Sequence, residues 1–72
     1  MTQDTYLRTV KGILATEKDI RIQASHESKL SALARKVARG ESEPSETVED
    51  IVSMFHPFVG RALREVLERA LR

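Results

Sequence analysis

The two histidines are the residues best suited to metal binding or to acid–base chemistry. A helical metal site commonly presents a second ligand four residues from the first. His26 has Ile22 and Leu30 at that spacing, and the residues at the same spacing from His56 are equally unable to bind a metal. We therefore predict that the protein binds no metal and no other cofactor.

Nucleophilic catalysis would need a base held against a serine, threonine or lysine by a third group. Ser25, His26 and Glu27 are consecutive, so on a helix their side chains point in different directions. The chain has no cysteine, no glycine-rich phosphate-binding loop and no G-x-S-x-G motif. We predict that the protein is not an enzyme and takes no small-molecule substrate.

Four basic residues are the best indication of nucleic-acid binding. The step of 100° per residue places Lys29, Arg35, Lys36 and Arg39 within about a third of a helical turn. Cations grouped in this way could neutralise phosphates and give salt-dependent binding. The alternative is the ordinary solvated face of an amphipathic helix.

Helical periodicity of the apolar residues predicts the elements that position these side chains. We expect helices over about 4–16, 26–39, 46–55 and 57–71, with a linker at 40–45, in a single domain of residues 1–72. Asp4 or Thr5, Ser25 and Ser45 are the expected N-terminal caps of the first three helices. Gly40 stands where a helix ends in a left-handed residue.

Two stretches have more than one interpretation. In residues 19–24 apolar and polar residues alternate as in a half-buried strand, but Ile20 and Ala24 also fit a continuing first helix. The apolar stripe of residues 48–71 keeps its register across Pro57, which favours one kinked helix. A break at His56, with Pro57 starting a fourth helix, is the alternative.

The C-terminal stripe is longer than two short helices can cover. Its residues could be buried within the domain or could pack against a second copy or a partner helix. The residues expected at such an interface are Phe55, Phe58, Val59, Leu63, Val66 and Leu67.

The order of a strand at 19–24, a helix at 26–39, a glycine turn and a helix from 46 resembles the ribbon-helix-helix family of dimeric repressors and antitoxins. The resemblance implies that strands from two subunits pair and enter the major groove of DNA. Arg21 and Gln23 would then point outward to read base edges, and Ile20 and Ile22 would face the core.

Length and composition limit the kind of fold and the cellular location that we expect. The 72 residues are 40% hydrophobic and 32% charged, which favours a small folded domain with marginal stability of its own. Because the chain has no cysteines, it has no disulfides, and oligomerisation is the remaining means of stabilising so small a domain. No apolar run approaches the ~20 residues of a membrane span, and the start lacks signal-peptide features, so we expect a cytoplasmic protein.

Charge is distributed unevenly along the chain. Residues 1–40 carry eight Lys and Arg against four Asp and Glu, whereas residues 41–72 carry four against seven. The two parts have net charges of +4 and −3, which suits head-to-tail pairing of copies or binding of a polyanion.

The sequence thus predicts an all-α bundle of three or four helices, completed by homodimerisation. The favoured function is that of a small regulatory or adaptor protein that binds another protein. A ribbon-helix-helix-like DNA-binding regulator is the alternative.

Overall fold

The computed structural model describes residues 1–55 and 60–72, and all regular secondary structure in these residues is helical. The elements are α1 (Gln3–Ala15), α2 (Ala24–Ala38), the 3₁₀ helix η1 (Pro44–Thr47), α3 (Val48–Val52) and α4 (Gly60–Ala70). The prediction of an all-α fold is therefore confirmed for the part of the chain that the structure describes.

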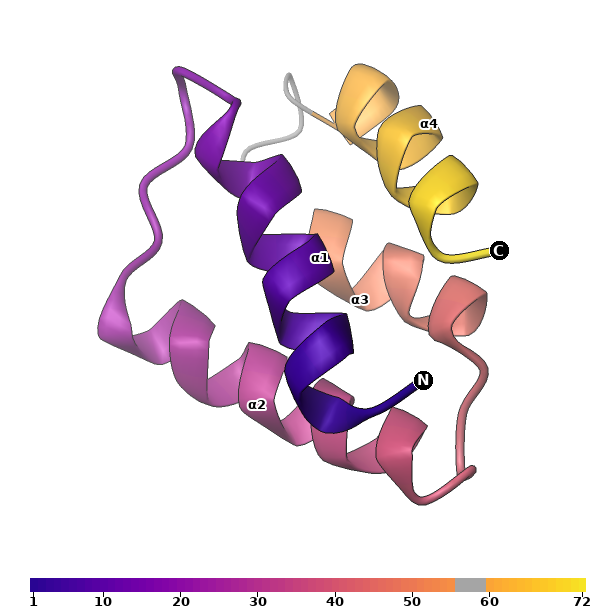
Figure 1. The fold of residues 1–72 in the computed structure, drawn as a ribbon. Coiled ribbons are helices and arrows are strands. Elements are labelled where there is room, and N and C mark those ends of the chain that lie inside the picture. The colour runs from indigo at the N-terminus through magenta and orange to yellow at the C-terminus, as the bar shows by residue number, and fades with distance from the viewer. Residues whose placement is uncertain (56–59) are drawn as a thin grey trace.

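Helix α1 lies in the middle of the bundle, packed against α2 on one side and α4 on the other, while α3 packs against α4 (Figure 1). Its buried residues, Tyr6, Val10 and Leu14, recur every four residues and form one stripe. The other buried apolar residues come from α2, α3, α4 and the residue after α4: Leu30, Leu33, Ala34, Val37, Val48, Ile51, Leu63, Leu67 and Leu71.

The radius of gyration is 11.1 Å. A globular chain of this length is expected to have a radius of gyration of about 11 Å. A single chain thus reaches the usual compactness with a core made of its own residues.

The first helix begins one residue earlier than expected, at Gln3, and its cap lies earlier than either of the expected caps. Thr2 is its N-cap, and the hydroxyl of Thr2 accepts the backbone N–H of Thr5 at 3.1 Å. Asp4 and Thr5 lie within the helix, so the caps expected there are wrong. Thr2 has the same capping chemistry, and its backbone is extended, as an N-cap residue requires.

The caps expected at Ser25 and Ser45 are also two residues too late. Helix α2 has Gln23 as its N-cap, and the Gln23 N–H donates to Nδ1 of His26 at 3.1 Å. Before η1, the Glu43 N–H donates to the carboxylate of Glu46 at 3.3 Å. In both cases a side chain three residues ahead accepts the N–H of the cap residue, as in a capping box.

Gly40 ends α2 as the sequence predicts, with a φ of +77°. The Gly40 N–H donates to the carbonyl of Val37 at 3.1 Å, and the Glu41 N–H donates to the carbonyl of Lys36 at 2.9 Å. These two bonds form a Schellman motif, which satisfies carbonyls that the end of a helix leaves without donors.

The expected linker at 40–45 is too long, because Pro44 begins η1. Proline suits the first residue of a helix, where its missing N–H has no intrahelical partner to lose. The third helical segment therefore starts at residue 44 rather than 46, and its α-helical part ends at Val52 rather than at residue 55.

Residues 20–23 form neither the strand nor the helix that their pattern allowed. A turn precedes them, in which the Ile20 N–H donates to the carbonyl of Glu17 at 3.3 Å. The alternation of side chains is nevertheless present, because Ile20 and Ile22 pack against the core while Arg21 and Gln23 are exposed.

The continuous kinked helix across Pro57 is wrong. Helix α3 ends at Val52, and tight i,i+3 turns follow, with the Met54 N–H donating to Ile51 and the Phe55 N–H donating to Val52. Pro57 and His56 lie outside the described residues. Helix α4 is a separate element that buries Leu63 and Leu67, and Leu71, which follows it, is also buried.

An ion pair joins α3 to α4, in which the guanidinium of Arg64 donates to the carboxylate of Glu49. This hydrogen bond and the positive charge of Arg64 lower the pKa of Glu49 below its ordinary value.

None of the helices described is long and apolar enough to cross a bilayer.

Candidate functional site

The four basic residues predicted to share a face of α2 are all exposed, and they divide into two pairs. Lys29 and Lys36 line a groove between α2 and α3, whereas Arg35 and Arg39 do not line it. Arg39 lies 4.0 Å from the carboxylate of Glu41, at the limit of an ion pair. Among the described residues, neither lysine belongs to an ion pair.

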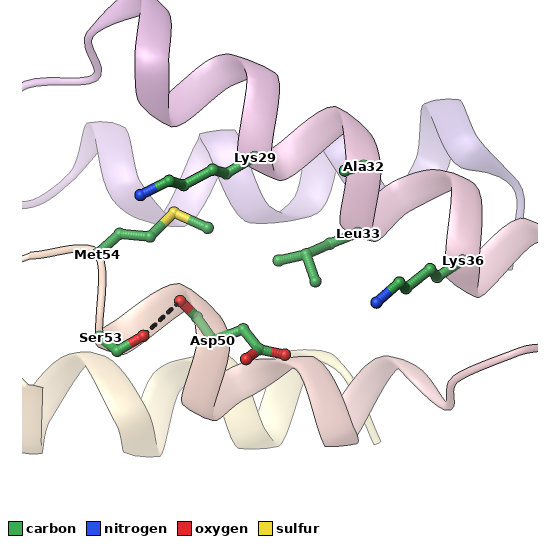
Figure 2. A pocket seen from close by; sticks show the side chains of 7 residues that line it. All are labelled: Lys29, Ala32, Leu33, Lys36, Asp50, Ser53 and Met54. Carbon is green, nitrogen blue, oxygen red and sulfur yellow. Dashed lines mark hydrogen bonds between the residues drawn. The ribbon is translucent and has the colours of Figure 1, made fainter.

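The groove has a volume of about 330 Å³ and combines apolar and charged surfaces. Its apolar lining consists of Ala32 and Leu33 from α2 and of Met54, which follows α3. Figure 2 shows the side chain of Leu33 between the two lysines, facing across the groove towards Met54 and Asp50. The apolar surface is therefore flanked along α2 by two ammonium groups.

The helix packing explains why this groove stays open. Helix α2 packs chiefly on α1, and α3 packs on α4 and η1, so the contact between α2 and α3 is slight. Leu33 is only 8% exposed and closes the core beneath the groove. Nearby, the rings of His26 and Phe55 lie 4.6 Å apart between their centroids and join the start of α2 to the segment after α3.

The opposite rim of the groove is formed by Asp50 and Ser53. The hydroxyl of Ser53 donates to the main-chain carbonyl of Asp50 at 3.0 Å (Figure 2). This bond directs the serine proton to the backbone rather than to a base. The carboxylate of Asp50 is exposed and opposes Lys36, so the two rims carry charges of opposite sign.

The sequence missed the residues that turn the basic face into a groove. Ala32, Leu33, Met54, Asp50 and Ser53, which line the groove, were not expected at a site. One signal was available, because Ala32 lies between Lys29 and Lys36 on the same helix face. No pattern in the sequence shows that α3 would stop at Val52 and leave Met54 beside α2.

The residues expected to read DNA lie apart from this groove. Arg21 and Gln23 are exposed, but neither lines the groove. The backbone of Gln23 is extended and its N–H serves as the capping donor to His26. Among the described residues no strand is present that could carry the two side chains into a DNA groove.

Of the six residues expected at a dimer or partner interface, the four that the structure describes have different environments. Leu63 and Leu67 are fully buried in the core of their own chain. Phe55 is half-buried against His26, and Val66 is 44% exposed. Phe58 and Val59 lie outside the described residues. Burial within the domain thus accounts for the two leucines.

A second polar cluster is buried and joins α1 to η1. Thr47 donates its hydroxyl hydrogen to the carbonyl of Pro44 at 2.6 Å, so the hydroxyl of Tyr6 must be the donor in its 2.7 Å bond to Thr47. Burial is the main cause that raises the pKa of Tyr6. Because Tyr6 is fully buried and Thr47 is 1% exposed, this cluster cannot meet a partner.

No group of three or more potential ligands close enough to hold a metal ion occurs among the described residues. Comparisons of the chain with protein-family models, with curated proteins and with solved structures find no match.

Proposed function

We propose that this chain is a small, non-enzymatic regulatory or adaptor protein that acts by binding another protein and by self-association. The observation that carries the proposal is the groove between α2 and α3, with its apolar surface between Lys29 and Lys36. Protein interfaces combine an apolar centre with a polar rim, and this groove has that arrangement on a small scale.

A protein partner suits the groove better than a nucleic acid. Binding to a phosphate backbone rests on cations, and a carboxylate within the contact surface repels it. Asp50 forms part of one rim of the groove, and its carboxylate is exposed. A protein can offer apolar, acidic and basic side chains together, which is what the two rims require.

The chemistry of the groove supports a binding role rather than catalysis. Its volume of about 330 Å³ is at the lower end of the range of pockets that enclose small ligands. Its one hydroxyl, on Ser53, donates to a main-chain carbonyl and is therefore not activated by a base.

Self-association is the second part of the proposal and would be weak. The opposite charges of residues 1–40 and 41–72 favour head-to-tail contacts. Among the described residues, the only large apolar side chains that are exposed are Met1 and Val66. Such a surface favours association driven by charge rather than association through an extensive apolar interface.

A photo-crosslinking amino acid in place of Ala32 tests the protein-binding role in cells of the source organism. The matched control carries it at Ala38, which is exposed on the same helix but does not line the groove. We expect a discrete protein adduct, heavier than a dimer of this chain, at position 32 and none at position 38. An excess of the wild-type chain, which lacks the photo-crosslinking amino acid, should compete for the partner and reduce the amount of adduct.

An unlabelled Ala32→Glu variant should compete poorly, because its carboxylate lies one helical turn from both Lys29 and Lys36 and can pair with them. Failure to obtain an adduct at position 32, or equal adducts at both positions, would contradict the proposed role of the groove.

The second candidate function is a ribbon-helix-helix-like DNA-binding dimer. The observation that favours it is the arrangement of residues 20–23, where the two isoleucines pack on the core while Arg21 and Gln23 are exposed. Titration of duplex DNA at two salt concentrations tests it. Tight, salt-sensitive binding that Arg21→Ala abolishes would favour this candidate, and a mass of one chain at high concentration would exclude it.

A further inference from the structure

We propose that the occupant of the α2–α3 groove is an acidic amphipathic helix of the partner protein. This helix places one apolar side chain on Leu33 and Met54, and it directs two carboxylates, seven residues apart, to Lys29 and Lys36. The inference rests on the proposed function and specifies the chemistry of the partner.

The spacing of the two lysines determines the spacing of the carboxylates. Lys29 and Lys36 are seven residues apart on α2, which corresponds to about 10.5 Å along the helix axis. A helix that lies alongside α2 repeats this distance between its own residues i and i+7. Residues i+3 and i+4 of the partner helix lie on the same face as its two acids and between them. An apolar side chain at either position would contact Leu33.

The charges in the groove favour acids on the side of the partner that faces α2. Both lysines are exposed, and neither takes part in an ion pair among the described residues. Partner carboxylates would thus gain contacts with Lys29 and Lys36 without displacing an existing pair. Asp50 on the opposite rim repels an acid and attracts a base, so it fixes which way the partner helix is rotated.

A second copy of this chain does not fit the same description. Val66 is the large apolar residue exposed on α4, and the residues that flank it seven apart are Ala62 and Arg69. Glu43 and Asp50 are acids at the required spacing, but Thr47 between them is buried. The described helices therefore offer no exposed acid–apolar–acid face to another copy.

Synthetic helical peptides provide the test with the full-length chain. The probe is a fluorescent alanine- and glutamine-based peptide of about 15 residues with glutamates at i and i+7 and leucine at i+4. Its isomer has both glutamates moved by two residues, which takes them off the leucine face. We expect salt-sensitive binding of the probe by fluorescence anisotropy and at least about tenfold weaker binding of the isomer.

Charge reversal in the protein identifies the groove. The double variant Lys29→Glu/Lys36→Glu should weaken binding of the probe by about tenfold or more and should bind a peptide with lysines in place of the glutamates. The double variant Arg35→Glu/Arg39→Glu makes the same charge change on the same helix outside the groove, and its affinity should fall by less than about threefold. Circular dichroism verifies that both variants remain helical.

Each contrary result has a definite meaning. Equal losses in the two double variants would overturn the inference in favour of a diffuse basic face. No binding of the probe, together with a specific adduct at position 32, would overturn the acidic helix and leave the proposed function standing. Absence of both would remove the proposed function as well. Binding of the groove to further copies of this chain instead of the probe would also overturn the inference.

Discussion

The side chain of Tyr6 is fully buried and carries a titratable hydroxyl. The free energy of unfolding should therefore depend on pH in the alkaline range. In the folded protein the hydroxyl donates to Thr47, which in turn donates to the carbonyl of Pro44. Burial disfavours the phenolate and raises the pKa of Tyr6 above its ordinary value of 10.0. The chain has no other tyrosine, so a single substitution isolates the effect.

We predict that Tyr6→Phe lowers the free energy of unfolding by about 1 kcal/mol at neutral pH through loss of the hydrogen bond to Thr47. Because the folded pKa is raised, the contribution of neutral Tyr6 is complete below pH 10 and is lost as pH rises towards the folded pKa. The difference between wild type and variant should therefore shrink above about pH 10. Urea titrations at several pH values measure it, and a constant difference would contradict the prediction.

Leu67 and Val66 are neighbours on α4 with opposite environments. Leu67 is fully buried and Val66 is 44% exposed. We predict that Leu67→Ala costs about 2–5 kcal/mol in the free energy of unfolding, because it leaves a cavity in the core. Val66→Ala should cost less than about 1 kcal/mol. Thermal denaturation of both variants provides the measurement, and similar costs would argue against the burial described for α4.

At the scale of helices, the sequence predicts that a helix is present better than it predicts the residues at which the helix begins and ends. The helical spacing of apolar residues follows the buried faces of these helices, as at Val10 and Leu14 in α1 and at Leu30 and Val37 in α2. The start of a helix depends on which of several polar residues caps it. That choice depends on local hydrogen bonds, such as the Gln23 N–H to His26, which composition does not reveal.

The largest error at this scale arose from extending one periodicity across the end of a helix. The apolar pattern persists in the sequence between residues 48 and 71, but α3 ends at Val52 and α4 is a separate helix that begins at Gly60. The same break makes the groove unpredictable. Its basic rim could be predicted from Lys29 and Lys36, whereas Met54 and Asp50 come to face α2 only through tertiary packing.

Two glycines give opposite predictions for the same substitution. At Gly40, whose φ is +77°, a Cβ would meet nothing within 4 Å, so only the backbone conformation opposes alanine. We predict that Gly40→Ala costs about 1–2 kcal/mol in the free energy of unfolding. Gly12 lies inside α1 with equally open space, and Gly12→Ala should stabilise by about 0.5–1 kcal/mol. Paired chemical denaturation curves test both signs, and a gain at Gly40 would contradict the left-handed cap.

At the scale of the whole molecule, the question is whether a second chain completes the core or only meets its surface. The buried residues of α1, α2, α3 and α4 form one cluster within a single chain, and the radius of gyration of 11.1 Å is that of a globular chain of this length. A homodimer would thus have little exposed apolar surface to bury among the described residues, and we expect the charge asymmetry to be its main driving force.

We predict that dilution separates the copies without unfolding them. Light scattering should give a mass of one chain, 8.1 kDa, at low micromolar concentration, while circular dichroism still shows a helical protein. Association at higher concentration should weaken as salt rises, because about 1 M salt shortens the Debye length from ~10 Å to ~3 Å. Loss of helix in step with dissociation would instead mean that the partner chain completes the core, since folding would then depend on protein concentration.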